Sequence, residues 1–224
     1  MTQPDPESAE PSLPALVAAG DAAKALAVLG ITVEEVYGAL LSGEQAAAST
    51  TLYHPSISPG VLRWIETVAT FRRLKVENDE WILREPANSP RVVAPDEQVS
   101  VMVITGNSLT GTSRTPSTRH KKGPSTARAV SENQNQLVFE LEFQVDSSGE
   151  ISDAVGPLTW VLLYYRASDP NETRVEVSLP RTITEGRISA WKHRIILPPL
   201  SHELSLPEGE RDDDIDFPII SRGR

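Results

Sequence analysis

Apolar residues near the start of the chain recur at helical spacing, in short stretches separated by polar residues and glycines. Thr32 opens a capping box with Glu35 three residues later, and this pattern predicts a helix over 33–41. The other stretches predicted to be helical are 13–19, 21–29 and 44–49. Helices this short are unstable alone, so we predict a small helical unit over residues 13–50 that packs together or on the rest of the chain.

The strongest helical pattern runs over residues 59–75. Its apolar residues fall on one stripe, made of Val61, Trp64, Ile65, Val68, Phe71 and Leu74. Ser58 can cap this helix, and Pro59 suits the first helical position, where its missing N–H costs nothing. We therefore expect a long helix that packs its apolar stripe on a sheet.

Beyond this helix the pattern changes to short stretches rich in β-branched residues, which predicts strands. The predicted strands are 81–83, 91–94, 99–105, 137–144, 159–166 and 173–179. The last two form the clearest hairpin, around the turn residues Asp169, Pro170 and Asn171. Residues 125–136 have the composition of a polar helix, and 186–196 fit a helix and a strand equally.

These elements predict an α+β fold, with a small N-terminal helical unit and a mainly antiparallel β-sheet packed on the long helix. Because the strands follow one another with short turns, we expect a meander rather than parallel crossovers. The predicted divisions are a disordered N-terminus (1–12), the helical unit (13–50), a body (51–200) with a long polar, basic loop at 106–128, and an acidic C-terminal tail (201–224).

Composition narrows the range of functions. The 224 residues contain no cysteine, so a disulfide, a thiolate metal ligand and a thiolate nucleophile are all excluded. Residues 1–15 lack the basic start and apolar stretch of a signal peptide, and no apolar run approaches the roughly 20 residues that span a bilayer. We therefore expect a cytoplasmic protein that does not bind membranes.

The formal net charge of −10 hides two blocks of opposite sign. Residues 203–217 contain seven acids and a single base, Arg211. Residues 114–128 contain no acid, one histidine and five bases, which are Arg114, Arg119, Lys121, Lys122 and Arg128. Because such cations can neutralise phosphates or carboxylates, we predict that these five form a binding surface for phosphate or for an acidic partner.

The acidic tail ends in a short apolar patch, residues 217–220. A charged run followed by an apolar patch is typical of a segment that becomes ordered when it docks on its own body or on a partner. The residues predicted to dock are Asp212, Asp213, Asp214, Asp216 and Phe217. Docking within one chain would bring this tail to the basic residues 119–122.

Residues 106–113 follow a predicted strand and have the glycine spacing of a phosphate-binding loop. However, Thr112 stands where that motif has the lysine that reaches the phosphates, and no capped helix follows. The sequence between Trp81 and Phe139 also contains no aromatic residue, so the basic stretch has no stacking platform for single-stranded nucleic acid.

Four acids invite a comparison with metal-dependent nucleases: Asp96, Glu140, Glu142 and Glu176. None of them belongs to the acid-x-lysine pair of that class, and the three glutamates more simply form the outward, polar face of alternating strands. The four histidines have no zinc-like spacing, and no serine-nucleophile motif is present. We identify no catalytic residue, no metal site and no cofactor.

We therefore predict a non-enzymatic binding or accessory protein of a bacterial-type cytoplasm, which works in a protein complex through residues 106–128 and the acidic tail. Two alternatives stay open. One is binding of nucleic acid or of a nucleotide through the bases of residues 114–128. The other is a divergent metal-dependent hydrolase or nuclease that uses Asp96 and strand carboxylates.

Overall fold

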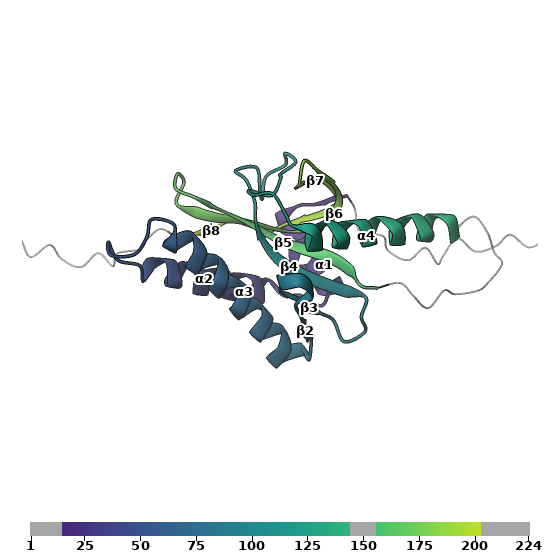
Figure 1. Ribbon diagram of the computed structural model, residues 1–224, viewed down its shortest axis with the longest axis horizontal. Helices are drawn as coiled ribbons and strands as arrows, with labels where there is room; N and C mark the ends of the chain where they lie inside the picture. Colours follow the sequence, from purple (N-terminus) through teal and green to yellow (C-terminus); the bar gives the residue numbers. More distant parts are fainter. Residues whose placement is uncertain (1–14, 144–155, 203–224) are drawn as a thin grey trace, which may run out of the picture.

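The computed structural model describes residues 15–143 and 156–202, and for residues 135–143 it describes only the backbone. Helices lie on both faces of one sheet (Figure 1). The strand order is β1-β7-β6-β5-β4-β3-β2, and β8 pairs with β6. The chain thus has an α+β fold with mainly antiparallel strands, which confirms the predicted fold class.

The bounds of the elements are as follows. The strands are β1 (Leu16–Val17), β2 (Ile82–Arg84), β3 (Arg91–Val93), β4 (Val99–Thr105), β5 (Leu158–Ala167), β6 (Glu172–Thr184), β7 (Arg187–Ile196) and β8 (Leu200–Ser201). The helices are α1 (Ala22–Val28), α2 (Val33–Ala48), α3 (Ser58–Asp79) and α4 (Pro124–Phe143), with 3-10 turns at Ala19–Asp21 and Pro86–Asn88.

Two strand pairs among the described residues run parallel, so the expectation of a simple meander is wrong. β4 and β5 lie side by side with Val101 opposite Trp160, because the chain returns through α4 before it enters β5. β1 runs parallel to β7, with Leu16 opposite Arg194. The other described pairs are antiparallel, including the predicted hairpin of β5 and β6.

The strand predicted over residues 137–144 is wrong, because residues 137–143 form the last turns of α4. Apolar residues at 137, 138 and 141 also have helical spacing, so a short alternating run does not distinguish the two structures. No glycine or proline interrupts residues 125–143, and the polar helix predicted at 125–136 therefore continues.

The N-terminal helices also differ from the prediction. Leu16 and Val17 form β1 rather than a helix, because they pair with β7. α2 runs unbroken through Gly43, where an added Cβ would lie 2.6 Å from the carbonyl oxygen of Arg63 in α3. This glycine allows α2 and α3 to approach closely and does not end the helix. Ser58 lies inside α3 and does not cap it.

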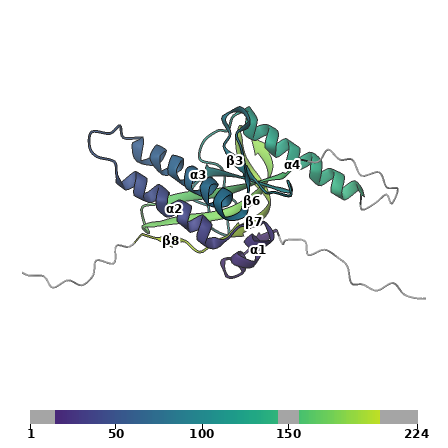
Figure 2. The ribbon, with the colours of Figure 1, turned by 90° about the horizontal axis from the view of Figure 1, so that it is seen from below.

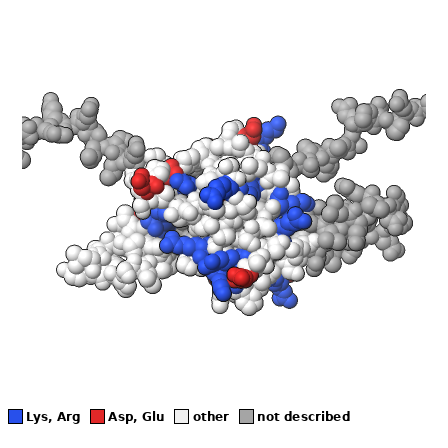
Figure 3. Space-filling model, turned by 90° about the horizontal axis from the view of Figure 1, so that it is seen from above, with Lys and Arg blue, Asp and Glu red and all other residues white. Residues whose placement is uncertain are grey.

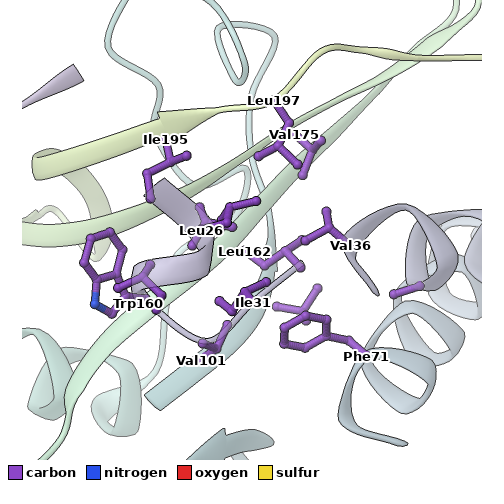
Figure 4. Close-up of a cluster of buried hydrophobic side chains, with 14 of the residues drawn as sticks. Leu26, Ile31, Val36, Phe71, Val101, Trp160, Leu162, Val175, Ile195 and Leu197 are labelled. Atoms are coloured by element: carbon purple, nitrogen blue, oxygen red, sulfur yellow. The ribbon is translucent and has the colours of Figure 1, made fainter. Parts of the chain in front are cut away.

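The larger core lies between the sheet and α1, α2 and α3 (Figures 1 and 2). Figure 4 shows its central side chains, which are Leu26, Ile31, Val36, Phe71, Val101, Trp160, Leu162, Val175, Ile195 and Leu197. The predicted capping box is confirmed at the start of α2. Thr32 Oγ1 accepts from the Glu35 amide at 3.1 Å, and Glu35 Oε2 accepts from the Thr32 amide at 2.9 Å.

The other face of the sheet carries a smaller core beneath α4. Its buried residues are Met102, Ile104, Ala129, Val130, Val161, Leu163 and Ile188. Asn133 fixes α4 on β5, because its side-chain oxygen accepts from the Thr159 amide at 2.8 Å and its nitrogen donates to the Thr159 carbonyl at 2.9 Å. Less apolar area is buried here, so polar contacts have a larger share in holding this face together.

Candidate binding groove

The connection between β4 and α4, residues 106–123, covers most of the long basic loop predicted over 106–128, whereas residues 124–128 begin α4. It folds back over the α4 face of the sheet, at the top of Figure 1 beside β7. The Thr118 amide donates to the Ile188 carbonyl at 3.1 Å, and the Lys122 amide donates to the Gly186 carbonyl at 2.6 Å. The Trp191 indole donates to the Pro116 carbonyl at 2.9 Å. These contacts hold the loop against β7.

A buried ion pair anchors the same loop to the middle of the sheet. Arg194 on β7 donates to the Glu176 carboxylate on β6 at 2.5 and 3.0 Å, and both side chains are buried. The same guanidinium donates to the loop carbonyls of Thr112 at 2.9 Å and Arg114 at 3.0 Å. The carboxylate also accepts from the Gly111 amide at 2.9 Å. The pair therefore links two strands to two parts of the loop.

In this loop, the backbone amides that a phosphate-binding loop would offer to its ligand already donate to groups of the protein. The Gly111 amide is bound to Glu176, and the amides of Gly106, Asn107 and Thr110 donate to the protein's own carbonyl groups. Gly111 has a φ of +69°, and a Cβ there would lie 2.9 Å from the Cβ of Arg174. The glycine spacing at 106–111 thus meets the needs of a tightly packed turn and leaves these amides unavailable for a nucleotide.

An open groove of about 960 Å³ lies between α3 and the end of this loop. Ile57, Val61 and Trp64 at the start of α3 form its apolar wall. Arg119 and Lys122 from the loop form its cationic wall, and His120 also lines the groove there. Residues 102–105 of β4, residues 87–90 and the start of α4 complete the lining.

The groove is open because β3 begins only at Arg91. Arg91 is the first residue of β3 and lies opposite Met102, and the preceding Pro90 has no N–H with which to continue the ladder. The edge of β4 beyond Met102 is therefore not covered by β3. The Trp64 indole donates to the Val103 carbonyl at 3.2 Å, and the Arg119 amide donates to the Thr105 carbonyl at 2.9 Å. These two bonds fix both walls relative to the strand.

Two residues of the apolar wall, Val61 and Trp64, belong to the first half of the stripe predicted on the long helix. In the second half of the stripe, Val68 and Phe71 are buried, as expected for packing on the sheet. In the first half, however, Val61 and Ile65 remain 44% and 43% exposed, and Trp64 is 36% exposed. The sequence shows the stripe but does not show that β3 begins only at Arg91, opposite Met102, so the groove could not be predicted.

The cationic wall has no internal counter-charge. None of the described residues that line the groove is acidic. Arg63 is paired with Glu44 at 2.6 Å, whereas Arg119 and Lys122 form no ion pair within the described part of the chain. Burial lowers the pKa of Lys122, because no carboxylate replaces the water that its ammonium loses. An acidic ligand would supply that missing charge.

Charge is also divided between the described residues and the rest of the chain. Residues 15–134 and 156–202 contain 18 Lys and Arg against 16 Asp and Glu, whereas the whole chain contains 21 against 31. The remaining residues thus hold three bases and 15 acids. Figure 3 shows Lys and Arg spread over the face that carries the loop, where Asp and Glu reach the surface at few places.

The structure brings two of the five predicted basic residues, Arg119 and Lys122, into the groove. Arg114 and Lys121 are exposed elsewhere on the loop. Arg128 projects from α4 and lies 3.7 Å from Glu132. The predicted docking residues Asp212, Asp213, Asp214, Asp216 and Phe217 lie outside the described residues, as does the N-terminus (1–12) that was predicted to be disordered.

The acids considered for a metal site occupy different parts of the fold. Asp96 lies in the turn before β4, whereas Glu176 lies opposite Leu163, which pairs with the far end of β4. This arrangement separates them by at least about 15 Å along the strands. Glu140 and Glu142 lie in α4, and Glu176 is buried rather than outward-facing, so the predicted polar strand face is wrong. Among the described residues no three His, Asp or Glu side chains gather as a metal site.

Within the part of the chain that the structure describes, no individual helix combines the length and apolar character needed to cross a membrane. One pair, Ala19–Val28 with Val33–Ala48, meets the criterion only when taken together and is bent by 104°. Comparison of the chain with protein-family models, curated proteins and solved structures gives no significant match.

Proposed function

We propose that this protein is a non-enzymatic binding module that holds a segment of a partner protein in the groove between α3 and the basic loop. The observation that carries the proposal is the pairing of an exposed apolar wall with a cationic wall that has no acid among its described lining residues. A segment that alternates or adjoins acidic and apolar side chains would satisfy both walls at once. Trp and Arg, which are both present here, are also the residues that most often dominate binding energy.

The anchoring of the loop supports this function. Arg119 and Lys122 stand on backbone that is bonded to β4 and to Gly186, so their positions are set before a ligand arrives. Binding to a preformed site avoids the entropy loss of ordering a loop, which favours affinity. The buried pair of Glu176 and Arg194 thus acts on the groove indirectly, by holding the segment that carries its cations.

Nucleic acid is the alternative that the same cations would serve. The groove suits nucleic acid less well than a protein segment. Trp64 is the one Phe, Tyr or Trp ring among the described lining residues, and its N–H already donates to the Val103 carbonyl. Contacts would be limited to the phosphate backbone, and the apolar wall would be left without a partner. A protein segment uses both walls.

The proposal is tested by selecting phage-displayed 12-residue peptides on the purified chain. The selection is repeated on a chain with Asp212→Asn, Asp213→Asn, Asp214→Asn and Asp216→Asn, since the tail has the chemistry expected of the ligand. We expect enriched peptides to combine Asp or Glu with Phe, Ile, Leu or Trp. Fluorescence polarisation of labelled peptides then gives their Kd, with a single-stranded dT20 oligonucleotide measured in parallel.

Two groove variants and one control decide the outcome. Arg119→Glu with Lys122→Glu, and separately Ile57→Ser with Val61→Ser, should each weaken peptide binding at least tenfold. Lys24→Glu with Arg84→Glu changes the charge equally at exposed positions outside the groove and should leave the Kd unchanged. If dT20 binds more tightly than every selected peptide, and its Kd is unchanged by Ile57→Ser with Val61→Ser, nucleic acid is the ligand. Absence of any enriched peptide also defeats the proposal.

A further inference from the structure

The groove and the acidic tail of the same chain are complementary in charge. The described lining residues include Arg63, Arg119 and Lys122 and no acid. Residues 203–217 carry seven acids and one base, and they are followed by an apolar patch at 217–220. The tail therefore combines the two kinds of side chain, acidic and apolar, that the two walls of the groove would bind.

The place where the described body ends also favours this pairing. His202 is the last residue before the tail, and its Nε2 lies 2.8 Å from Thr173 Oγ1. Thr173 Oγ1 donates to Glu44 at 3.3 Å, and Glu44 accepts from Arg63, which lines the groove, at 2.6 Å. Three successive side-chain contacts thus connect the start of the tail to the groove.

The tail is also long enough to extend from His202 into the groove. An extended chain spans about 3.3–3.6 Å per residue, so the residues from His202 to Phe217 can cover roughly 50 Å. The acids of residues 208–216 would then lie along Arg119 and Lys122, and Phe217 would lie against the apolar wall of α3. A tethered segment has a high local concentration, so a weak contact is sufficient for occupancy.

We propose that the tail, residues 203–220, occupies this groove in the free protein and competes there with the partner segment. The inference rests on the proposed function, since it assigns to the same groove an internal competitor. A partner must then displace the tail, and its apparent affinity is lowered by the fraction of molecules in which the groove is filled. Changes that weaken the contact of the tail with the groove should raise affinity for the partner.

The absence of cysteine allows a direct test, because a single introduced cysteine can be labelled alone. A spin label at Ser221→Cys on the full chain should broaden the NMR signals of the Trp64 indole N–H and of the amides at residues 119–123. Signals from α1 and β2 serve as the reference and should keep their intensity. The same broadening should disappear in about 1 M salt, where charges are screened within about 3 Å.

A charge exchange separates specific docking from general attraction. Arg119→Glu with Lys122→Glu should abolish the broadening, and adding Asp213→Lys with Asp214→Lys should restore it. Lys24→Glu with Arg84→Glu should leave it intact. If the labelled wild-type chain shows no broadening at the groove, or if broadening survives both the salt and the Arg119 and Lys122 changes, the tail does not dock there.

A second measurement distinguishes failure of this inference from failure of the proposed function. Neutralising Asp212, Asp213, Asp214 and Asp216 to Asn should tighten binding of a selected peptide at least threefold. Peptides that bind the groove equally tightly with and without these changes would overturn the tail as competitor and leave the binding function intact. A docked tail in a protein for which no peptide is enriched would leave the tail contact intact and overturn the partner-binding function.

Discussion

The two faces of the sheet differ in the interactions that stabilise them. On the face covered by α1, α2 and α3, buried side chains such as Phe71 and Leu162 form one large apolar cluster. On the face covered by α4 and the loop, the apolar cluster is smaller, and Glu176 and Arg194 are buried beneath the loop. The first face buries mostly apolar surface, whose stabilisation is non-directional, and it also holds one buried ion pair, Lys75 with Glu35 at 3.1 Å, between its helices. The second face depends more on directional polar bonds, which fix individual backbone atoms of the loop.

This difference separates stability from positioning. An apolar cluster tolerates small shifts, since its energy depends on area and packing. A buried carboxylate and guanidinium require their partners at definite positions, because an unpaired buried charge is costly. The protein thus places its polar anchor where a long loop must present cations in one arrangement. The apolar face supplies stability to the whole, and the polar face supplies geometry to the groove.

Matched changes on the two faces should have similar global effects and different local ones. Glu176→Ala leaves the Arg194 guanidinium buried without its counter-charge, and we expect a loss of about 3–5 kcal/mol in the free energy of unfolding. Phe71→Ala opens a cavity in the large core and should cost about 3–5 kcal/mol as well. Urea denaturation followed by fluorescence measures both losses.

Native-state hydrogen exchange then distinguishes the two variants. In Glu176→Ala the amides of residues 111–119 should exchange well before global unfolding, because the carboxylate that binds Gly111 and holds Arg194 is missing. In Phe71→Ala the same amides should exchange with the rest of the body. A double variant, Glu176→Leu with Arg194→Met, should recover most of the free energy of unfolding. The amides of residues 111–119 should still exchange before global unfolding in this variant. Equal loop protection in all three proteins would contradict the division of roles.

What the sequence could predict follows this same division. Periodicity identifies the long helix, the capping box at Thr32 and the hairpin of β5 and β6, because these signals are local. The pairing of Glu176 with Arg194 joins residues 18 apart on adjacent strands beneath a distant loop, and nothing local marks it. Glu176 in fact has the alternation of an exposed strand residue. The loop that covers this face is what turns an apparently outward residue into a buried one.

The groove shows the same limit. Its basic residues are evident in the sequence as an acid-free stretch, but only Arg119 and Lys122 of the five reach it. The selection among them depends on where the loop crosses the end of β4. The apolar wall lies beside the part of β4 that β3 does not cover, because β3 begins only after Pro90. Such edges arise from strand lengths in three dimensions rather than from composition.

A change in volume without charge should affect the apolar face alone. Gly43→Ala places a methyl group about 2.2 Å from Thr67 Oγ1 and 2.6 Å from the Arg63 carbonyl, so α2 and α3 must separate. We expect a loss of about 1–3 kcal/mol in the free energy of unfolding, measured by urea denaturation. Gly60→Ala is the control, since a Cβ there meets no atom within 4 Å. If the loop amides in Gly43→Ala exchange hydrogen before the whole protein unfolds, the two faces of the sheet are coupled.

A single polar contact on the loop face should have a smaller and more local effect. Trp191→Phe keeps an aromatic ring but removes the N–H that donates to the Pro116 carbonyl. We expect a loss of about 1 kcal/mol in the free energy of unfolding, with faster exchange confined to residues near 116–119. Trp160→Phe, in the large core, is the comparison for ring size. A uniform rise in exchange over the whole sheet would contradict a local role for this bond.

The smallest expected effect concerns pH at the point where β8 meets β6. Burial lowers the pKa of His202 below its ordinary 6.5, so the docked β8 favours the neutral ring. Its stabilising contribution is complete above about pH 6.5 and is lost as pH falls through the lowered pKa, because the undocked ring takes up the proton first. Protection of the His202 amide, which donates to the Asn171 carbonyl at 2.9 Å, should fall between pH 7 and 5. In His202→Gln it should stay constant, and an equal fall there would assign the effect to another group.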